Sequence, residues 1–233
     1  MNRTTARLLI AAAAVSALPQ VAVAGLTLPI NATVSNSVQT FPADNLAAFD
    51  LVKLTIEGRG TTYVAKAGTP GETNGTTTPV AFGFPITKIV IGNKLNIASG
   101  SAVGSALLLQ RFNDDTSATV GFTLANFTID YNRKQVLADT TPVGGKTTVQ
   151  MPLYNFVATT PLGLKYVFPL SVTGHEVLGQ LALTPQAKAV FTSALELPEF
   201  ALFALEFDYG TLTQDISLKL RSRPVSAKPY VAN

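Results

Sequence analysis

The chain has 233 residues, with 17 Lys and Arg against 14 Asp and Glu, one His and no Cys. The absence of cysteine excludes a cysteine nucleophile, a thiolate zinc site and an iron–sulfur cluster, and one histidine cannot build a multi-histidine zinc site. The basic residues form no dense stretch that would follow a nucleic-acid backbone. We therefore expect no metal, no cofactor and no nucleic acid partner.

Residues 1–24 have the pattern of a cleaved signal peptide. Two arginines precede an apolar run at 8–15, and Ala-Val-Ala at 22–24 offers small residues to a signal peptidase. The apolar run is too short for a hydrocarbon core of roughly 30 Å. Two of the 17 basic residues lie in this segment, which leaves 15 against 14 and a net charge of +1. The sequence predicts an exported bacterial protein, periplasmic or extracellular, whose mature chain (25–233) has no transmembrane segment.

Much of the mature chain alternates apolar and polar residues with a period of two. The pattern is clear at 51–58, 87–97 and 214–220, and such alternation is typical of an antiparallel sheet with one buried face. Turn-forming residues predict hairpin ends; they lie at 112–119, 132–134 and 142–148. About twelve to fourteen short strands are expected, at spacings typical of a sandwich or barrel.

Three other segments break this alternation. Residues 67–79 contain three Gly and two Pro and predict an exposed, mobile loop without a large anchoring side chain. Residues 41–51 favour a short helix with Asp44 near its cap. A second helix is predicted at about 185–195, with Thr184 as N-cap and Pro185 in the first position. Its apolar side chains recur with helical spacing at Ala187, Val190, Phe191, Ala194 and Leu195.

No change of composition and no internal repeat divides the chain. The sequence therefore predicts one mainly β domain at 25–233: an antiparallel β-sandwich or distorted barrel with one short packed helix at about 185–195. Two small sandwiches that share an interface are the alternative.

The candidate catalytic groups are sparse. GSAVGS at 100–105 lacks the G-x-S-x-G pattern of a nucleophile elbow. Asn113-Asp114-Asp115 fits either a calcium-binding loop or a polar hairpin turn. Carboxylates gather at 196–208, where Glu206 and Asp208 are expected side by side on one face of a strand. A glycoside hydrolase needs two carboxylates facing each other, so this pattern favours a solvated strand face. We expect no enzyme.

Four residues are candidates for contact with a ligand. Tyr154, Tyr166 and Tyr209 are amphipathic side chains that suit the wall of an apolar pocket between sheets. His175 is the only histidine and is the fourth candidate, although its place after Gly174 predicts a turn position. Because no partner stands at a recognisable spacing from it, a structural place is favoured over a chemical one.

Three short segments resemble secreted bacterial Hta-type haem-binding domains. They are FTIDY…VLAD, GQLALTPQA and DYGTL, which together extend over residues 122–213. The resemblance implies a haem-binding β fold. The chain lacks the Trp- and aromatic-rich opening segment of that family and its paired Tyr and His context, so no functional residue is carried over.

Three hypotheses about function follow. The first is a secreted or periplasmic, non-catalytic protein with a binding or structural role in the bacterial envelope and an unidentified protein partner. The second is a carrier of a small apolar ligand, haem or lipid, in a cavity between sheets. The third is a carboxylate-dependent hydrolase.

Overall fold

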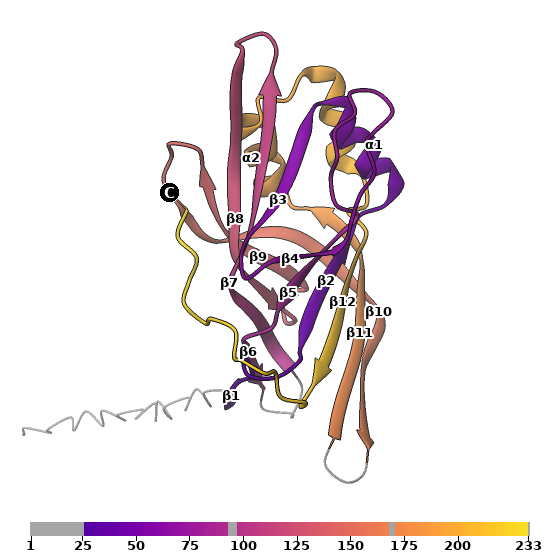
Figure 1. Ribbon diagram of the computed structural model, residues 1–233, viewed down its shortest axis with the longest axis vertical. Coiled ribbons are helices and arrows are strands. Elements are labelled where there is room, and N and C mark those ends of the chain that lie inside the picture. The colour runs from indigo at the N-terminus through magenta and orange to yellow at the C-terminus, as the bar shows by residue number, and fades with distance from the viewer. Residues whose placement is uncertain (1–25, 93–96, 168–170, 233) are drawn as a thin grey trace, which may run out of the picture.

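One antiparallel sheet, strongly curled into a half-barrel, makes up most of the molecule (Figure 1). The computed structural model describes residues 26–92, 97–167 and 171–232. The predicted signal peptide lies outside the described residues. Within them the sheet has twelve strands, which confirms the predicted mainly β, antiparallel fold.

The strands follow the chain in long hairpins. Their bounds are β1 Leu26–Pro29, β2 Asn36–Thr40, β3 Leu54–Gly60, β4 Tyr63–Lys66, β5 Ala81–Pro85, β6 Lys88–Ile91, β7 Ile97–Asn113, β8 Ala118–Asp130, β9 Gln135–Pro142, β10 Thr148–Val167, β11 Ser171–Leu183 and β12 Thr211–Ser217. Their order in the sheet is β1-β6-β7-β8-β9-β10-β11-β12-β2-β5-β4, and β3 also pairs with β7. Strand β2 therefore lies far from its sequence neighbours, between β12 and β5.

The sheet curls because β5 and β6, which lie near opposite ends of the strand order, follow each other directly in the chain. Strand β5 leads through Ile86 and Thr87 into β6, and β6 pairs with β7. The backbone N–H of Thr87 also donates to the carbonyl oxygen of Ser101 on β7, at 2.8 Å. The inner faces of β2 and β5 are thereby held opposite β7 and β8, which encloses the core.

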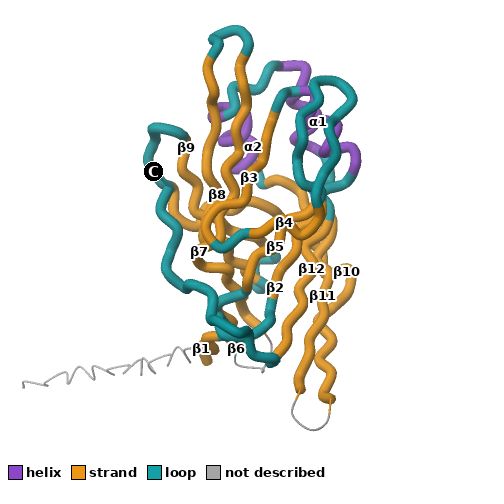
Figure 2. The backbone as a smooth tube through the Cα atoms, viewed as in Figure 1, coloured by secondary structure: helices purple, strands orange, loops and turns teal. Residues whose placement is uncertain are grey.

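Helical segments gather at one end of the molecule, and the β10–β11 hairpin extends at the other (Figure 2). They are α1 Ala43–Leu51, α2 Pro185–Ala194 and the 3-10 helix η1 Glu199–Glu206. The Thr184 cap is confirmed, since its hydroxyl accepts the N–H of Ala187 at 3.2 Å. The helix predicted at 41–51 is also confirmed, but Pro42 occupies its N-cap and Asp44 lies in the first turn.

Two expectations about strands are wrong. Glu206 and Asp208 are predicted side by side on a strand, yet residues 199–206 form the 3-10 helix η1, with Ala201 and Leu205 buried, and Asp208 lies beyond its end. At the C-terminal end, β12 stops at Ser217. Leu218 and Leu220 follow it with exposed side chains.

Arg111 on β7 holds both α-helices against the sheet. Its side chain is buried and donates to the carbonyl oxygens of Val52, Leu195 and Glu196 at 3.0–3.2 Å. Val52 caps α1, and the other two residues follow α2 directly. The last carbonyls of a helix lack intrahelical donors and carry partial negative charge, so one guanidinium satisfies two helix ends at once.

The 67–79 segment closes around a carboxylate. Asp50 of α1 accepts the backbone N–H groups of Thr73, Asn74 and Thr76 at 2.7–3.0 Å. These hydrogen bonds, that of Asn74 foremost, lower the pKa of Asp50 although burial opposes them. Asn74 adds a side-chain contact, because its Nδ2 donates to the carbonyl oxygens of Asp50 and Leu51 at 2.7 and 3.2 Å, so the segment is anchored to the end of α1.

Candidate ligand-binding site

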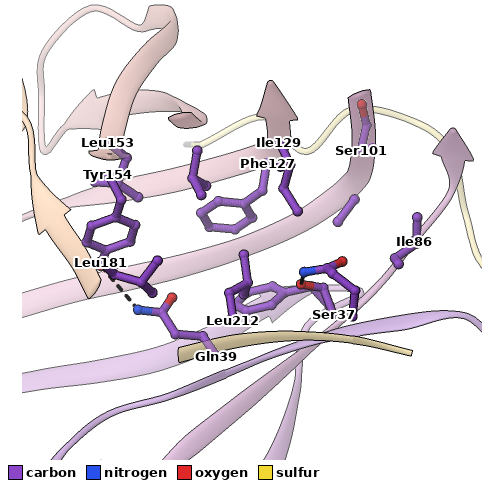
Figure 3. A pocket seen from close by; sticks show the side chains of 15 residues that line it. Ser37, Gln39, Ile86, Ser101, Phe127, Ile129, Leu153, Tyr154, Leu181 and Leu212 are labelled. Atoms are coloured by element: carbon purple, nitrogen blue, oxygen red, sulfur yellow. Dashed lines mark hydrogen bonds between the residues drawn. The ribbon is translucent and has the colours of Figure 1, made fainter. Parts of the chain in front are cut away.

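An apolar cavity lies inside the curl of the sheet (Figure 3). The residues that line it come from eight strands and from the short connection between β5 and β6. The empty space among its side chains is about 490 Å³ including the part that opens to solvent, of which about 30 Å³ admits the centres of water molecules. The cavity is therefore narrow. Its larger apolar side chains are Phe84, Ile86, Phe127, Ile129, Val136, Leu153, Leu181 and Leu212.

Three polar side chains stand on one wall of this cavity, and Ser101 lines it from β7. Ser37 and Gln39 lie on β2 and Gln214 on β12, and the register pairs Gln214 with Ser37 and Leu212 with Gln39. Since cross-strand partners point to the same face, all three polar groups face inward. Each is at most 6% exposed. Gln39 Nε2 donates to the Tyr154 hydroxyl at 3.2 Å, and Gln214 Nε2 donates to Ser37 Oγ at 2.7 Å.

A second apolar cavity lies beneath the helices, with about 320 Å³ of empty space including its open part. Tyr209 lines it, whereas Tyr154 lines the first cavity, and their ring centroids are 5.5 Å apart. The tyrosine pair thus stands between the two cavities. Burial raises the pKa of both phenols, so both are neutral near pH 7.

One buried carboxyl group lies next to the polar wall. Glu176 on β11 is the cross-strand partner of Gln214 and is 4% exposed. It accepts the hydroxyl of Tyr131 at 2.6 Å. Burial raises the pKa of Glu176, and the hydrogen bond from Tyr131 opposes that shift. This group is therefore easier to protonate than an exposed glutamate.

Sequence reasoning missed Gln39, Gln214 and Glu176. A signal was present for two of them. Gln214 stands in phase with Leu212 and Ile216, and Glu176 in phase with Leu178, so both occupy positions that alternation assigns to the buried face. A polar residue at an apolar position of a strand indicates a buried polar group that needs a partner.

The four predicted ligand contacts lie in different places. Tyr154 lines the cavity and Tyr209 packs behind it, so the structure brings these two together. Tyr166 is 65% exposed near the end of the β10–β11 hairpin and does not line the cavity. His175 lies within β11 rather than at a turn, and its half-exposed ring places Nδ1 2.8 Å from Asp215 Oδ1 on the outer face.

The catalytic candidates have structural partners. Asp114 forms an ion pair with Lys53, and Glu206 forms one with Lys188; the nitrogen–oxygen distance is 2.6 Å in both.

Asp208 follows η1 in a loop, not on a strand beside Glu206, and accepts hydrogen bonds from the backbone N–H groups of Leu181 and Gly210. Across the described ranges no group of three or more His, Cys, Asp or Glu is placed to hold a metal ion.

No protein-family model and no curated protein matches the chain. Two solved structures from Corynebacterium glutamicum are remotely similar to it. The C-terminal domain of HtaA has a TM-score of 0.41 at 13% identity, over 78% of this chain and 96% of that domain. The heme-binding protein HtaB has a TM-score of 0.42 at 12% identity, over 82% of this chain and 96% of its own. Likenesses this distant carry no function to this chain. In the described part of the chain no helix is long and apolar enough to cross a membrane.

Proposed function

We propose that this protein binds a small, mostly apolar ligand inside the curl of its sheet and acts as a carrier without changing the ligand chemically. The observation that supports this proposal is the first cavity, with its apolar side chains and one short polar wall. Ligand sites typically have this composition, with a few polar groups that fix orientation, and a volume of roughly 300–1,000 Å³. The cavity as it stands, with about 30 Å³ open to water, is far smaller than that range, so a ligand fits only when the side chains of its wall move apart.

The narrowness of the cavity limits the ligand to a slender one. Each methylene transferred from water into such a site contributes about 0.8 kcal/mol, before the cost of association is subtracted. Because β2, β12 and β11 present their side chains from a continuous sheet, the wall can widen by rotamer changes more readily than by backbone movement. A single alkyl or isoprenoid chain suits this geometry.

Haem does not fit the cavity as it stands. Iron in haem proteins is held by His, Cys, Met or Tyr, and among the described residues Tyr154 is the one side chain of these types in the lining. Its hydroxyl already contacts Gln39, and burial raises its pKa, which disfavours the tyrosinate that binds iron. His175 stands on the outer face. A lipid-like ligand is therefore the better candidate of the two.

We infer that the carrier acts in an exported, non-catalytic setting. The signal-peptide pattern of residues 1–24 supports export to the periplasm or the medium. Between the two roles first considered for an envelope protein, structural or binding, the apolar cavity with its polar wall favours binding.

Native mass spectrometry of protein purified from its own host tests the carrier function. We expect a retained ligand as added mass, lost after organic extraction and regained with a lipid extract. Leu212→Phe, which fills the cavity, should bind less ligand, whereas Thr213→Phe on the opposite face of β12 should bind as the wild type does. An extracted protein that takes up nothing from the extract, or equal uptake by the two variants, would contradict the proposal.

A further inference from the structure

We propose that the ligand carries an uncharged hydrogen-bonding group, a hydroxyl or an amide, which lies between Gln39 and Gln214 while its apolar body fills the rest of the cavity. This inference rests on the proposed function and specifies the chemical class of the ligand. It excludes fatty-acid anions and alkylammonium cations as the preferred occupants.

The first support is the unused hydrogen-bonding capacity of the two carboxamides. Gln39 and Gln214 are 5% and 2% exposed. Among the described residues each side chain forms one hydrogen bond, through Nε2, and neither Oε1 accepts one. A carboxamide has two N–H donors and an oxygen with two lone pairs, and buried polar groups are normally paired.

The spare groups border open space. The fully enclosed side-chain atoms without a partner, among the described residues, are Asn45 Oδ1 and Thr140 Oγ1. The oxygens of Gln39 and Gln214 are not among them, and both residues line the cavity. Figure 3 shows the Gln39 carboxamide at the cavity wall beside Tyr154. A ligand group in the cavity is therefore within the reach of these atoms.

A hydroxyl or an amide suits either orientation of the carboxamides. The partners of Gln39 and Gln214 are hydroxyl groups, which can donate as well as accept. If a carboxamide were turned over, its oxygen would accept from the same hydroxyl, and its N–H groups would face the cavity in place of the oxygen. A ligand group that both donates and accepts meets both cases.

The second support is the absence of charge in the lining. In the described part of the chain, no Lys, Arg, His, Asp or Glu lines the cavity. An unpaired ion in such a site loses its hydration without compensation. The ionisable group beside the polar wall is Glu176, which repels an anion when it is ionised and whose carboxyl group already accepts the Tyr131 hydroxyl. A neutral group avoids both costs.

Isothermal titration calorimetry of the extracted full-length protein with 1-decanol, decanoate and decylammonium at pH 7 tests the inference. The three probes share one alkyl chain and differ in the charge of their end group. We expect 1-decanol to bind at least about tenfold more tightly than either ion, because the ions must lose their hydration in an unpaired site. If decanoate or decylammonium binds as tightly as 1-decanol, the inference is wrong while the carrier function stands. If none of the probes binds, the proposed function fails as well.

Two variants assign the preference to the polar wall. Gln39→Met and Gln214→Met preserve volume, and each should weaken 1-decanol about three- to tenfold while 1-decene binds as before, since one hydrogen bond contributes that much. Thr213→Val on the outer face of β12 is the control and should leave all affinities unchanged. An unchanged ratio of 1-decanol to 1-decene in both Met variants would overturn the assignment. The wild-type comparison of charged and neutral probes decides the question even if a variant does not fold.

Discussion

The rings of Tyr154 and Tyr209 lie with their centroids 5.5 Å apart, and each lines a different apolar cavity. Tyr154 also accepts a hydrogen bond from Gln39, so it is tied to the polar wall. Tyr209 packs instead against Phe49 of α1 and Phe191 of α2. The pair therefore separates a space within the sheet from a space beneath the helices, and in the proposed carrier we expect it to limit the length of the ligand.

Removing the Tyr209 ring should join the two cavities. We expect Tyr209→Ala to improve the affinity for 1-tetradecanol relative to 1-decanol. The longer chain can then bury more of its apolar surface in the second cavity, which the Tyr209 ring blocks in the wild type. Titration of an alcohol series measures this change. The variant should also lose about 3–5 kcal/mol of unfolding free energy, as large-to-small core changes do. Tyr209→Phe keeps the ring and should keep the wild-type chain-length profile; the same profile in Tyr209→Ala would show that the ring does not limit length.

A single tryptophan can report on the cavity, because the chain has none. Phe127 lines the cavity and packs on Phe84 with a centroid distance of 4.9 Å. We expect the emission of Phe127→Trp to change in intensity or wavelength when 1-decanol binds. Phe112 is an exposed aromatic on β7 and does not line the cavity, so Phe112→Trp is the control. Equal responses from the two variants would argue against binding in the cavity.

Loss of the Arg111 guanidinium should destabilise the helical end of the molecule. Arg111→Met leaves three carbonyl oxygens near helix ends without their donor, and we expect a loss of about 3 kcal/mol in the free energy of unfolding. Urea denaturation measures it. Arg59 pairs with Glu57 on the surface, and Arg59→Met should change stability by less than about 1 kcal/mol. Similar losses in both variants would mean that the carbonyl contacts contribute little.

The Asp50 carboxylate should make stability depend on pH. Its pKa is lowered in the folded protein, so its contribution is present above the unfolded pKa of about 4 and is lost as pH falls through the lower folded value. We expect Asp50→Asn to be less stable than the wild type at pH 7, with a difference that shrinks on acidification below about pH 4.

Hydrogen exchange locates this effect. The backbone N–H groups of Thr73, Asn74 and Thr76 donate to Asp50 and should lose protection in Asp50→Asn. Asp44 lies on the same helix with an exposed side chain, and Asp44→Asn should leave these amides unchanged. A wild-type level of protection in Asp50→Asn would contradict the anchoring role of the carboxylate.

Local patterns predicted the elements well where one face is buried. Thr184 and Pro185 start α2 as expected, and the hairpin turn after Asp130 joins β8 to β9. The same patterns failed at 199–208, where two carboxylates were expected on a strand. A 3-10 helix forms at 199–206 instead, where Ala201 and Leu205 pack beside residues of α1 and α2 that are distant in the sequence.

The sequence by itself determined the antiparallel sheet and the packed helix, because alternation and helix capping act between residues a few positions apart. The tertiary structure decided the cavity and its chemistry. Gln39 and Tyr154 are 115 residues apart, and Ser37 and Gln214 are 177 apart. They meet only because β2 inserts between β12 and β5. That pairing depends on the burial of whole sheet faces, which is a property of the entire chain rather than of any local segment.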